Sequence, residues 1–132
     1  MYKSTDISHV HFEPTQRCQA LCPMCDRTNN PHIKNSELTV DQFKQIIDSS
    51  FAKQLNSFLM CGNHGDPMVA KDTLDMYEWL RYNNSNLYLH MTTNGGGRSD
   101  DWWRNIAKVF GKHGRVTFSV DGLEDTNHLY RQ

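Results

Sequence analysis

The sequence predicts an α/β fold, a partial TIM-like (βα) barrel of about four parallel strand-helix units. Short segments rich in β-branched and aromatic residues alternate with longer segments whose apolar residues recur at helical spacing, and this order favours parallel strands joined by right-handed crossovers. Most of the polar and glycine-rich motifs directly follow a predicted strand. We therefore expect these motifs to meet at the carboxyl ends of the strands, where ligands of such folds bind.

The first predicted elements are a strand over residues 9–13 and a helix that begins after Thr39. The strand alternates polar and apolar side chains, among them two histidines, before Pro14 ends it. Thr39 and Gln42 form a capping box at the start of the helix. Apolar residues then recur at helical spacing as far as Phe51, which predicts one continuous helix with one buried face.

The rest of the chain repeats the alternation. It predicts a strand over residues 57–61, a helix over 73–82, a strand over 87–92, a helix over 100–110, a strand over 116–120 and the opening of a further helix over 123–132. Ser99 caps the helix over 100–110, and its expected buried face is Trp103, Ile106, Ala107 and Phe110.

Length, charge and apolar patterning bound the class of protein. A chain of 132 residues suffices for one domain, so residues 1–132 are expected to form a single core. Fourteen Lys and Arg against fifteen Asp and Glu, with no block of like charge, argue against a nucleic-acid-binding face. The absence of a long apolar run or an export signal predicts a cytoplasmic protein without a membrane span.

A complete barrel needs about 250 residues. This chain supplies about half of that length, so it is expected to be a fragment, to close by dimerisation or to remain an open sheet.

Three of the four cysteines form a C-x₃-C-x₂-C motif between the first strand and the first helix. They are Cys18, Cys22 and Cys25, and their clustering is unlike the spread of a disulfide framework. Thiolates suit iron–sulfur clusters and zinc, and three of them leave one iron of a four-iron cluster without a protein ligand. The motif therefore predicts a metal site with an open coordination position.

A zinc site is the alternative reading of the same region. Cys22 and Cys25 with Cys61 and His64 would provide four tetrahedral ligands, although this set leaves Cys18 unexplained. Taken alone, Cys61 lies in an apolar strand and is expected to be a small buried residue.

The cysteine motif and three later loops resemble the radical S-adenosylmethionine superfamily. The family's motif is C-x₃-C-x₂-C after the first barrel strand. Residues 64–67, His-Gly-Asp-Pro, are similar to its Gly-Gly-Glu-Pro motif, residues 93–95 to its threonine-asparagine-glycine segment, and residues 119–122 to its strand 4 segment. Here His64 and Asp66 stand where glycine and glutamate are usual. The family's strands 5 and 6 have no counterpart, so the resemblance implies the N-terminal portion of the barrel without its C-terminal half.

The resemblance implies a radical enzyme. Cys18, Cys22 and Cys25 would hold a [4Fe–4S] cluster, and reductive cleavage of S-adenosylmethionine would yield a 5′-deoxyadenosyl radical that abstracts hydrogen from an unknown substrate. A flavodoxin- or ferredoxin-like protein would supply the electron. The implied contacts to S-adenosylmethionine are Gly65, Asp66, Thr93, Asn94, Ser119 and Asp121. The alternative function is a truncated or non-catalytic iron–sulfur or zinc-binding module that serves as an interaction or structural unit.

Overall fold

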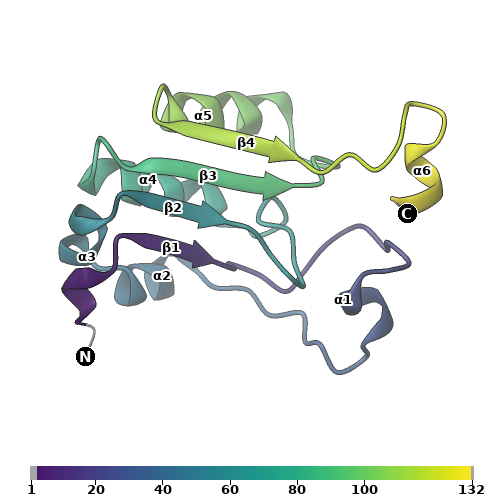
Figure 1. The fold of residues 1–132 in the computed structure, drawn as a ribbon, viewed down its shortest axis with the longest axis horizontal. Coiled ribbons are helices and arrows are strands. Elements are labelled where there is room, and N and C mark those ends of the chain that lie inside the picture. Colours follow the sequence, from purple (N-terminus) through teal and green to yellow (C-terminus); the bar gives the residue numbers. More distant parts are fainter. Residues whose placement is uncertain (1–2, 132) are drawn as a thin grey trace.

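A computed structural model, which describes residues 3–131, contains one parallel sheet of four strands in the order β1-β2-β3-β4. The strands are β1 (His9–Phe12), β2 (Ser57–Met60), β3 (Tyr88–Thr93) and β4 (Gly114–Phe118). Each strand pairs in parallel with the next along the chain, so all four carboxyl ends lie at one edge of the sheet (Figure 1). The predicted α/β class is confirmed.

Helices cover one face of this sheet. The helical elements are η1 (Ser4–Asp6), α1 (Asp26–Asn29), α2 (Val40–Ile46), α3 (Ser49–Gln54), α4 (Thr73–Asn83), α5 (Asp100–Phe110) and α6 (Asn127–Tyr130). In Figure 1, α2, α4 and α5 lie behind the strands, while α1 and α6 lie beyond the carboxyl ends. Within residues 3–131, every helix is too short or too polar to cross a membrane.

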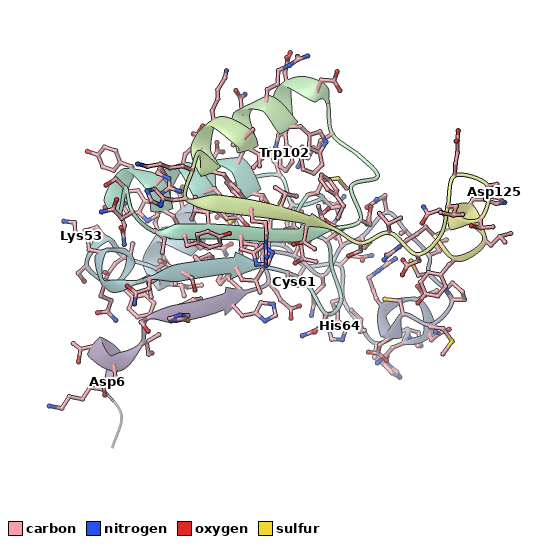
Figure 2. The ribbon with its side chains drawn as sticks, turned by 45° about the horizontal axis from the view of Figure 1, so that its top comes forward. Asp6, Lys53, Cys61, His64, Trp102 and Asp125 are labelled. Carbon is pink, nitrogen blue, oxygen red and sulfur yellow. The ribbon has the colours of Figure 1, made fainter. Side chains whose placement is uncertain are left out.

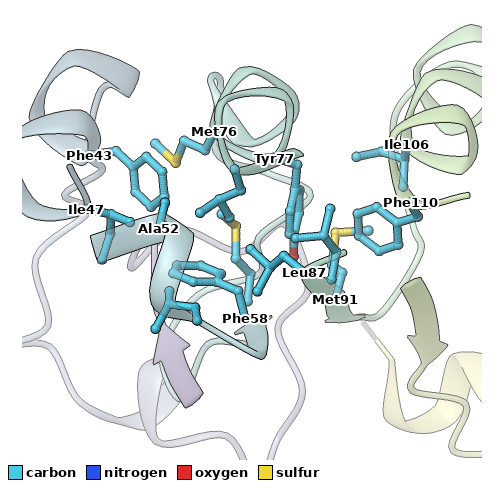
Figure 3. Close-up of a cluster of buried hydrophobic side chains, with 14 residues drawn as sticks. Phe43, Ile47, Ala52, Phe58, Met76, Tyr77, Leu87, Met91, Ile106 and Phe110 are labelled. Atoms are coloured by element: carbon cyan, nitrogen blue, oxygen red, sulfur yellow. The ribbon is translucent and has the colours of Figure 1, made fainter. Parts of the chain in front are cut away.

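The hydrophobic core lies between the sheet and its helices (Figure 3). Phe43 of α2 and Phe58 of β2 are fully buried and pack edge to face, with ring centroids 5.8 Å apart. Tyr77 of α4 is fully buried against Phe110 of α5, and its hydroxyl donates to the carbonyl of His90 at 2.8 Å. Because the buried hydroxyl of Tyr77 has an acceptor, its burial leaves no unsatisfied hydrogen-bond donor in the core.

The prediction of one continuous helix from Thr39 to Phe51 is wrong. The structure divides it into α2 and α3, because the Asp48 carboxylate accepts a hydrogen bond from the Phe51 backbone N–H at 2.8 Å and caps a new helix. Asp-Ser-Ser at residues 48–50 favours such a cap over helix continuation. Phe51 consequently lies only partly buried.

Two smaller predictions also need correction. Ala107 was expected on the buried face of α5, yet it is exposed, while Ile106 and Phe110 are buried as expected. Strand β4 lies two residues earlier than predicted, because Gly111 ends α5 with a positive φ of 52° and the chain reverses at once.

Candidate functional site

All nine residues predicted for the site line a single pocket of about 330 Å³ at the carboxyl ends of the strands. They are Cys18, Cys22, Cys25, Gly65, Asp66, Thr93, Asn94, Ser119 and Asp121. The pocket walls thus come from the segments that follow all four strands, as the motif positions predicted. This placement brings the residues together, and their individual roles stay predictions.

The loop after β2 packs directly against the segment that leads into the cysteine motif. A Cβ atom at Gly65 would lie 1.9 Å from the carbonyl oxygen of Thr15, so only glycine allows this approach. The next backbone N–H, that of Asp66, donates to the carbonyl of Arg17 at 2.9 Å. The start of the cysteine loop is therefore fixed to the end of the neighbouring strand.

The carboxylate of Asp66 joins the loops after β2 and β3. The side chain is 5% exposed, and its oxygens accept hydrogen bonds from the Thr93 hydroxyl at 2.7 Å, the Asn94 backbone N–H at 2.7 Å and the Met68 backbone N–H at 3.0 Å. Asp66 therefore binds the loops after β2 and β3 and shapes the pocket by holding Thr93 and Asn94 in place.

Asn94 contacts the first cysteine of the motif. Its amide nitrogen lies 3.5 Å from Cys18 Sγ, and its amide oxygen accepts hydrogen bonds from Gln19 Nε2 at 2.5 Å and from the Gly96 backbone N–H at 2.8 Å. The loop after β3 thereby holds one end of the cysteine segment.

The other side of the cysteine segment is held from the C-terminal helix region. Arg131 pairs with the carboxylate of Asp121, and its Nη1 donates to Cys22 Sγ at 3.4 Å. Only 24% of the Arg131 side chain is exposed. This contact places a guanidinium beside a predicted cluster ligand, and it ties the end of β4 to the cysteine loop.

The three motif cysteines are free thiols with different exposures. Cys22 is buried, whereas Cys18 and Cys25 are partly exposed. Burial raises the pKa of the Cys18 thiol, and the nearby Asp66 carboxylate acts in the same direction. In residues 3–131, no three histidine, cysteine or acidic side chains converge closely enough to hold a single metal ion.

Cys61 differs from its sequence expectation, and His64 pairs with an acid outside the cysteine motif. Cys61 was expected in the core, but it is partly exposed and lines the same pocket as the motif cysteines. Figure 2 labels Cys61 and His64 among the side chains of the molecule. Burial nonetheless raises the pKa of its thiol. His64 Nε2 lies 3.2 Å from the Asp26 carboxylate, so the imidazole contacts the start of α1.

Sequence reasoning missed several residues of the pocket. Tyr130 and Arg131 line it from the last helical segment, and Gln19 supports Asn94 from inside the cysteine motif. Arg131 lies nine positions after the strand 4 segment and belongs to no recognisable motif. The signal for Gln19 was its place beside Cys18, which puts a polar side chain next to the expected ligand.

Comparison with known proteins relates the chain to one enzyme by sequence. No family model matches it. The GTP 3′,8-cyclase of Desulforamulus reducens is 25% identical over 124 residues, which are 89% of this chain and 35% of that enzyme. The chain thus spans about a third of the length of the curated relative that it matches.

Solved structures share the fold. SuiB of Streptococcus suis bound to S-adenosylmethionine superposes with a TM-score of 0.71 at 16% identity, covering 93% of this chain and 27% of SuiB. The complex of SuiB with its precursor peptide SuiA gives a TM-score of 0.70 at 14% identity, over 93% of this chain and 26% of SuiB. BtrN in complex with AdoMet and 2-DOIA gives 0.70 at 14% identity, over 88% of this chain and 47% of BtrN.

These comparisons confirm two predictions from the sequence. The solved structures confirm that the four-stranded sheet corresponds to part of a TIM-like barrel. The sequence relative supports the predicted resemblance to the radical S-adenosylmethionine superfamily. The matched relatives are enzymes.

Proposed function

We propose that this chain, a radical S-adenosylmethionine protein, holds a [4Fe–4S] cluster through Cys18, Cys22 and Cys25 and binds S-adenosylmethionine in the adjoining pocket. The observation that carries the proposal is the shared pocket, in which the three thiols meet polar residues from the ends of all four strands. Such convergence on one rim is how barrel enzymes assemble a site from separate loops.

The cysteine set suits a cluster. A four-iron cluster takes one thiolate at each of three separate irons, so its ligands need to line one pocket without converging on a single ion. The three thiols are free, and neighbouring loops hold two of them, through Asn94 at Cys18 and Arg131 at Cys22. When bound and reduced, the cluster would supply the electron that cleaves S-adenosylmethionine for hydrogen-atom abstraction.

The chain's own residues would bind and orient the cofactor. Polar groups of Asn94, Ser119 and Asp121 line the pocket and offer contacts to its amino acid and ribose portions. Gly65 and Asp66 would act mainly by fixing the loop geometry, because the buried carboxylate already accepts three hydrogen bonds from the protein. The protein would thus supply position and exclusion of water, and the cofactor the radical chemistry.

The remaining expectations extend this proposal. A flavodoxin- or ferredoxin-like protein would reduce the cluster, and residues 1–132 would form one radical S-adenosylmethionine core domain. Within residues 3–131, β1 and β4 each pair with a single strand. Further strands from a second half barrel or a partner copy would complete the barrel.

A zinc module is the second candidate. One observation favours it, namely that Cys61 and His64 line the same pocket as Cys22 and Cys25. In that case the protein would be a structural or interaction unit without S-adenosylmethionine cleavage.

A matched pair of variants separates the two candidates. Cys18 belongs only to the cluster set and Cys61 only to the zinc set, and both are partly exposed, so either alanine variant should fold. Wild type, Cys18→Ala and Cys61→Ala are reconstituted anaerobically with iron and sulfide, then analysed for iron, acid-labile sulfide and zinc.

The proposal predicts about four irons and four sulfides per chain in wild type and in Cys61→Ala, with loss of most of both in Cys18→Ala. Zinc at one per chain that survives in Cys18→Ala and disappears in Cys61→Ala would contradict the cluster and support the zinc module.

A further inference from the structure

The face of the sheet opposite the helices carries an unusual set of side chains. Residues alternate along each strand, so those between the buried Phe58, Met60, Leu89 and Met91 point away from the core. The strand registers place four of these side chains in one row across the sheet, namely His11, Leu59, His90 and Arg115. Thr92 and Thr117 pair in the next row toward the carboxyl ends.

This composition fits neither usual way of covering a parallel sheet. A sheet with helices on both faces has near-continuous apolar strands, and a packed barrel interior is filled by bulky branched residues. The row instead holds two histidines and an arginine around a single leucine, with threonines beside it. Such a face is suited to water and a polar ligand rather than to a packed apolar layer.

The charge on this face is positive. The four strands contain no Asp or Glu, and Arg115 is exposed on the outer strand β4. Acids adjoin the face at its carboxyl end. Glu13, just beyond β1, accepts a hydrogen bond from Asn63 at 2.6 Å. Asp66 is engaged by the loops after β2 and β3, and Asp121 pairs with Arg131. Burial and the charge of Arg115 lower the pKa of His90, so His90 is a neutral hydrogen-bonding group near pH 7. Its Nε2 lies 3.0 Å from the Thr117 hydroxyl.

The face is continuous with the site pocket. Thr92 lies two residues beyond His90 on β3, and Ser119 lies two residues beyond Thr117 of β4. Both Thr92 and Ser119 line the pocket. Two residues along a strand span about 7 Å. A molecule resting on the row would therefore extend to the pocket in which the proposed chemistry takes place.

We propose that this face binds an anionic oxygen-rich group of the substrate, a phosphate or a carboxylate, with Arg115 as its charge partner and His90 as a hydrogen-bonding partner. A guanidinium beside neutral donors is the usual recognition element for such groups. That this anionic group belongs to a substrate rests on the proposed function, whereas binding of the anion itself does not.

The test measures anion binding without the cluster. Inorganic triphosphate and, separately, citrate are titrated into the unreconstituted protein, and the imidazole proton resonances of His90 and His11 are followed by NMR. Arg115→Gln is compared with Arg104→Gln, whose arginine is exposed on α5 and pairs with Asp100 and Asp101. Circular dichroism checks that both variants fold.

We expect saturable shifts at His90 with at least one of the anions, binding weakened about tenfold or more by Arg115→Gln, and unchanged binding in Arg104→Gln. Stronger binding of triphosphate identifies a phosphate site, and stronger binding of citrate a carboxylate site. No shift with either anion, or equal weakening in both variants, would overturn the proposal. Because no iron is present, failure of the cluster proposal leaves this result unaffected, and iron analysis reports that failure separately.

Discussion

The two ends of the sheet use their polar side chains differently. At the amino ends, the five N–H groups of the Arg81 guanidinium lie within hydrogen-bond distance of six backbone carbonyl oxygens, which belong to α5 and to the segments that follow α4 and α5. Asn84 likewise donates to carbonyls at the end of α3. At the carboxyl ends, thiols, amides and hydroxyls instead line an open pocket of about 330 Å³.

Polar groups at the amino ends therefore contribute to stability, and those at the carboxyl ends to the candidate site. Polar groups at the amino ends satisfy backbone acceptors that helix termini leave unpaired, so they hold the layers together. Polar groups at the carboxyl ends line the pocket and face a ligand, and Asp66, Asn94 and Asp121 also hold the neighbouring loops in place. Substitutions at the two ends should therefore change different measurable quantities.

The largest effect on stability is expected for Arg81→Met at the amino ends. Loss of the guanidinium leaves several partly buried carbonyls without a donor, which should lower the free energy of unfolding by about 2–4 kcal/mol. Urea denaturation measures the change, with Arg104→Met on the exposed face of α5 expected to stay within about 0.5 kcal/mol of wild type. Equal stability of the two variants would break the proposed division between the ends.

A smaller effect is expected for Asp66→Asn at the carboxyl ends. An amide cannot accept all three hydrogen bonds that the buried carboxylate accepts, and the cost should be about 1–3 kcal/mol. Because Asn94 is released from its partner, and because the Asp66 charge no longer raises the pKa of the Cys18 thiol, Cys18 should also react faster with iodoacetamide. Asp125→Asn, on the exposed turn before α6, is the control, and unchanged Cys18 reactivity in Asp66→Asn would contradict the positioning role.

The smallest effect is the pH dependence that His90 contributes. Its folded pKa lies below the ordinary 6.5, so the unfolded chain binds more protons in the window just below that value. Stability from this group is complete above pH 6.5 and falls as the pH drops through that window. Urea midpoints from about pH 7.5 to about pH 5.5 should fall less in His90→Gln than in wild type. Parallel profiles would show that His90 does not contribute.

Much of the fold followed from local patterns, because capping residues and apolar spacing act over a few positions. Thr39, Ser99 and the glycine after Phe110 mark helix ends that the structure contains. The break between α2 and α3 was missed because apolar spacing carries straight through Asp48, whose cap has the stronger local effect.

The site was predictable in membership but not in its internal contacts. The motifs identified nine residues that line one pocket, since each follows a strand of a parallel sheet. The contacts of Asn94 with Cys18 and of Arg131 with Cys22 join residues more than seventy positions apart, and no local pattern encodes them. The same holds for the row that contains His90 and Arg115, which depends on strand register.

A radical S-adenosylmethionine site requires three cysteines that leave one iron open to the cofactor, and electron paramagnetic resonance tests this directly. The reconstituted, dithionite-reduced protein is measured before and after addition of S-adenosylmethionine. We expect the signal of a reduced four-iron cluster whose g-values change on addition, because the cofactor would bind the open iron. A protein without this signal, or a signal that S-adenosylmethionine leaves unchanged, would contradict it.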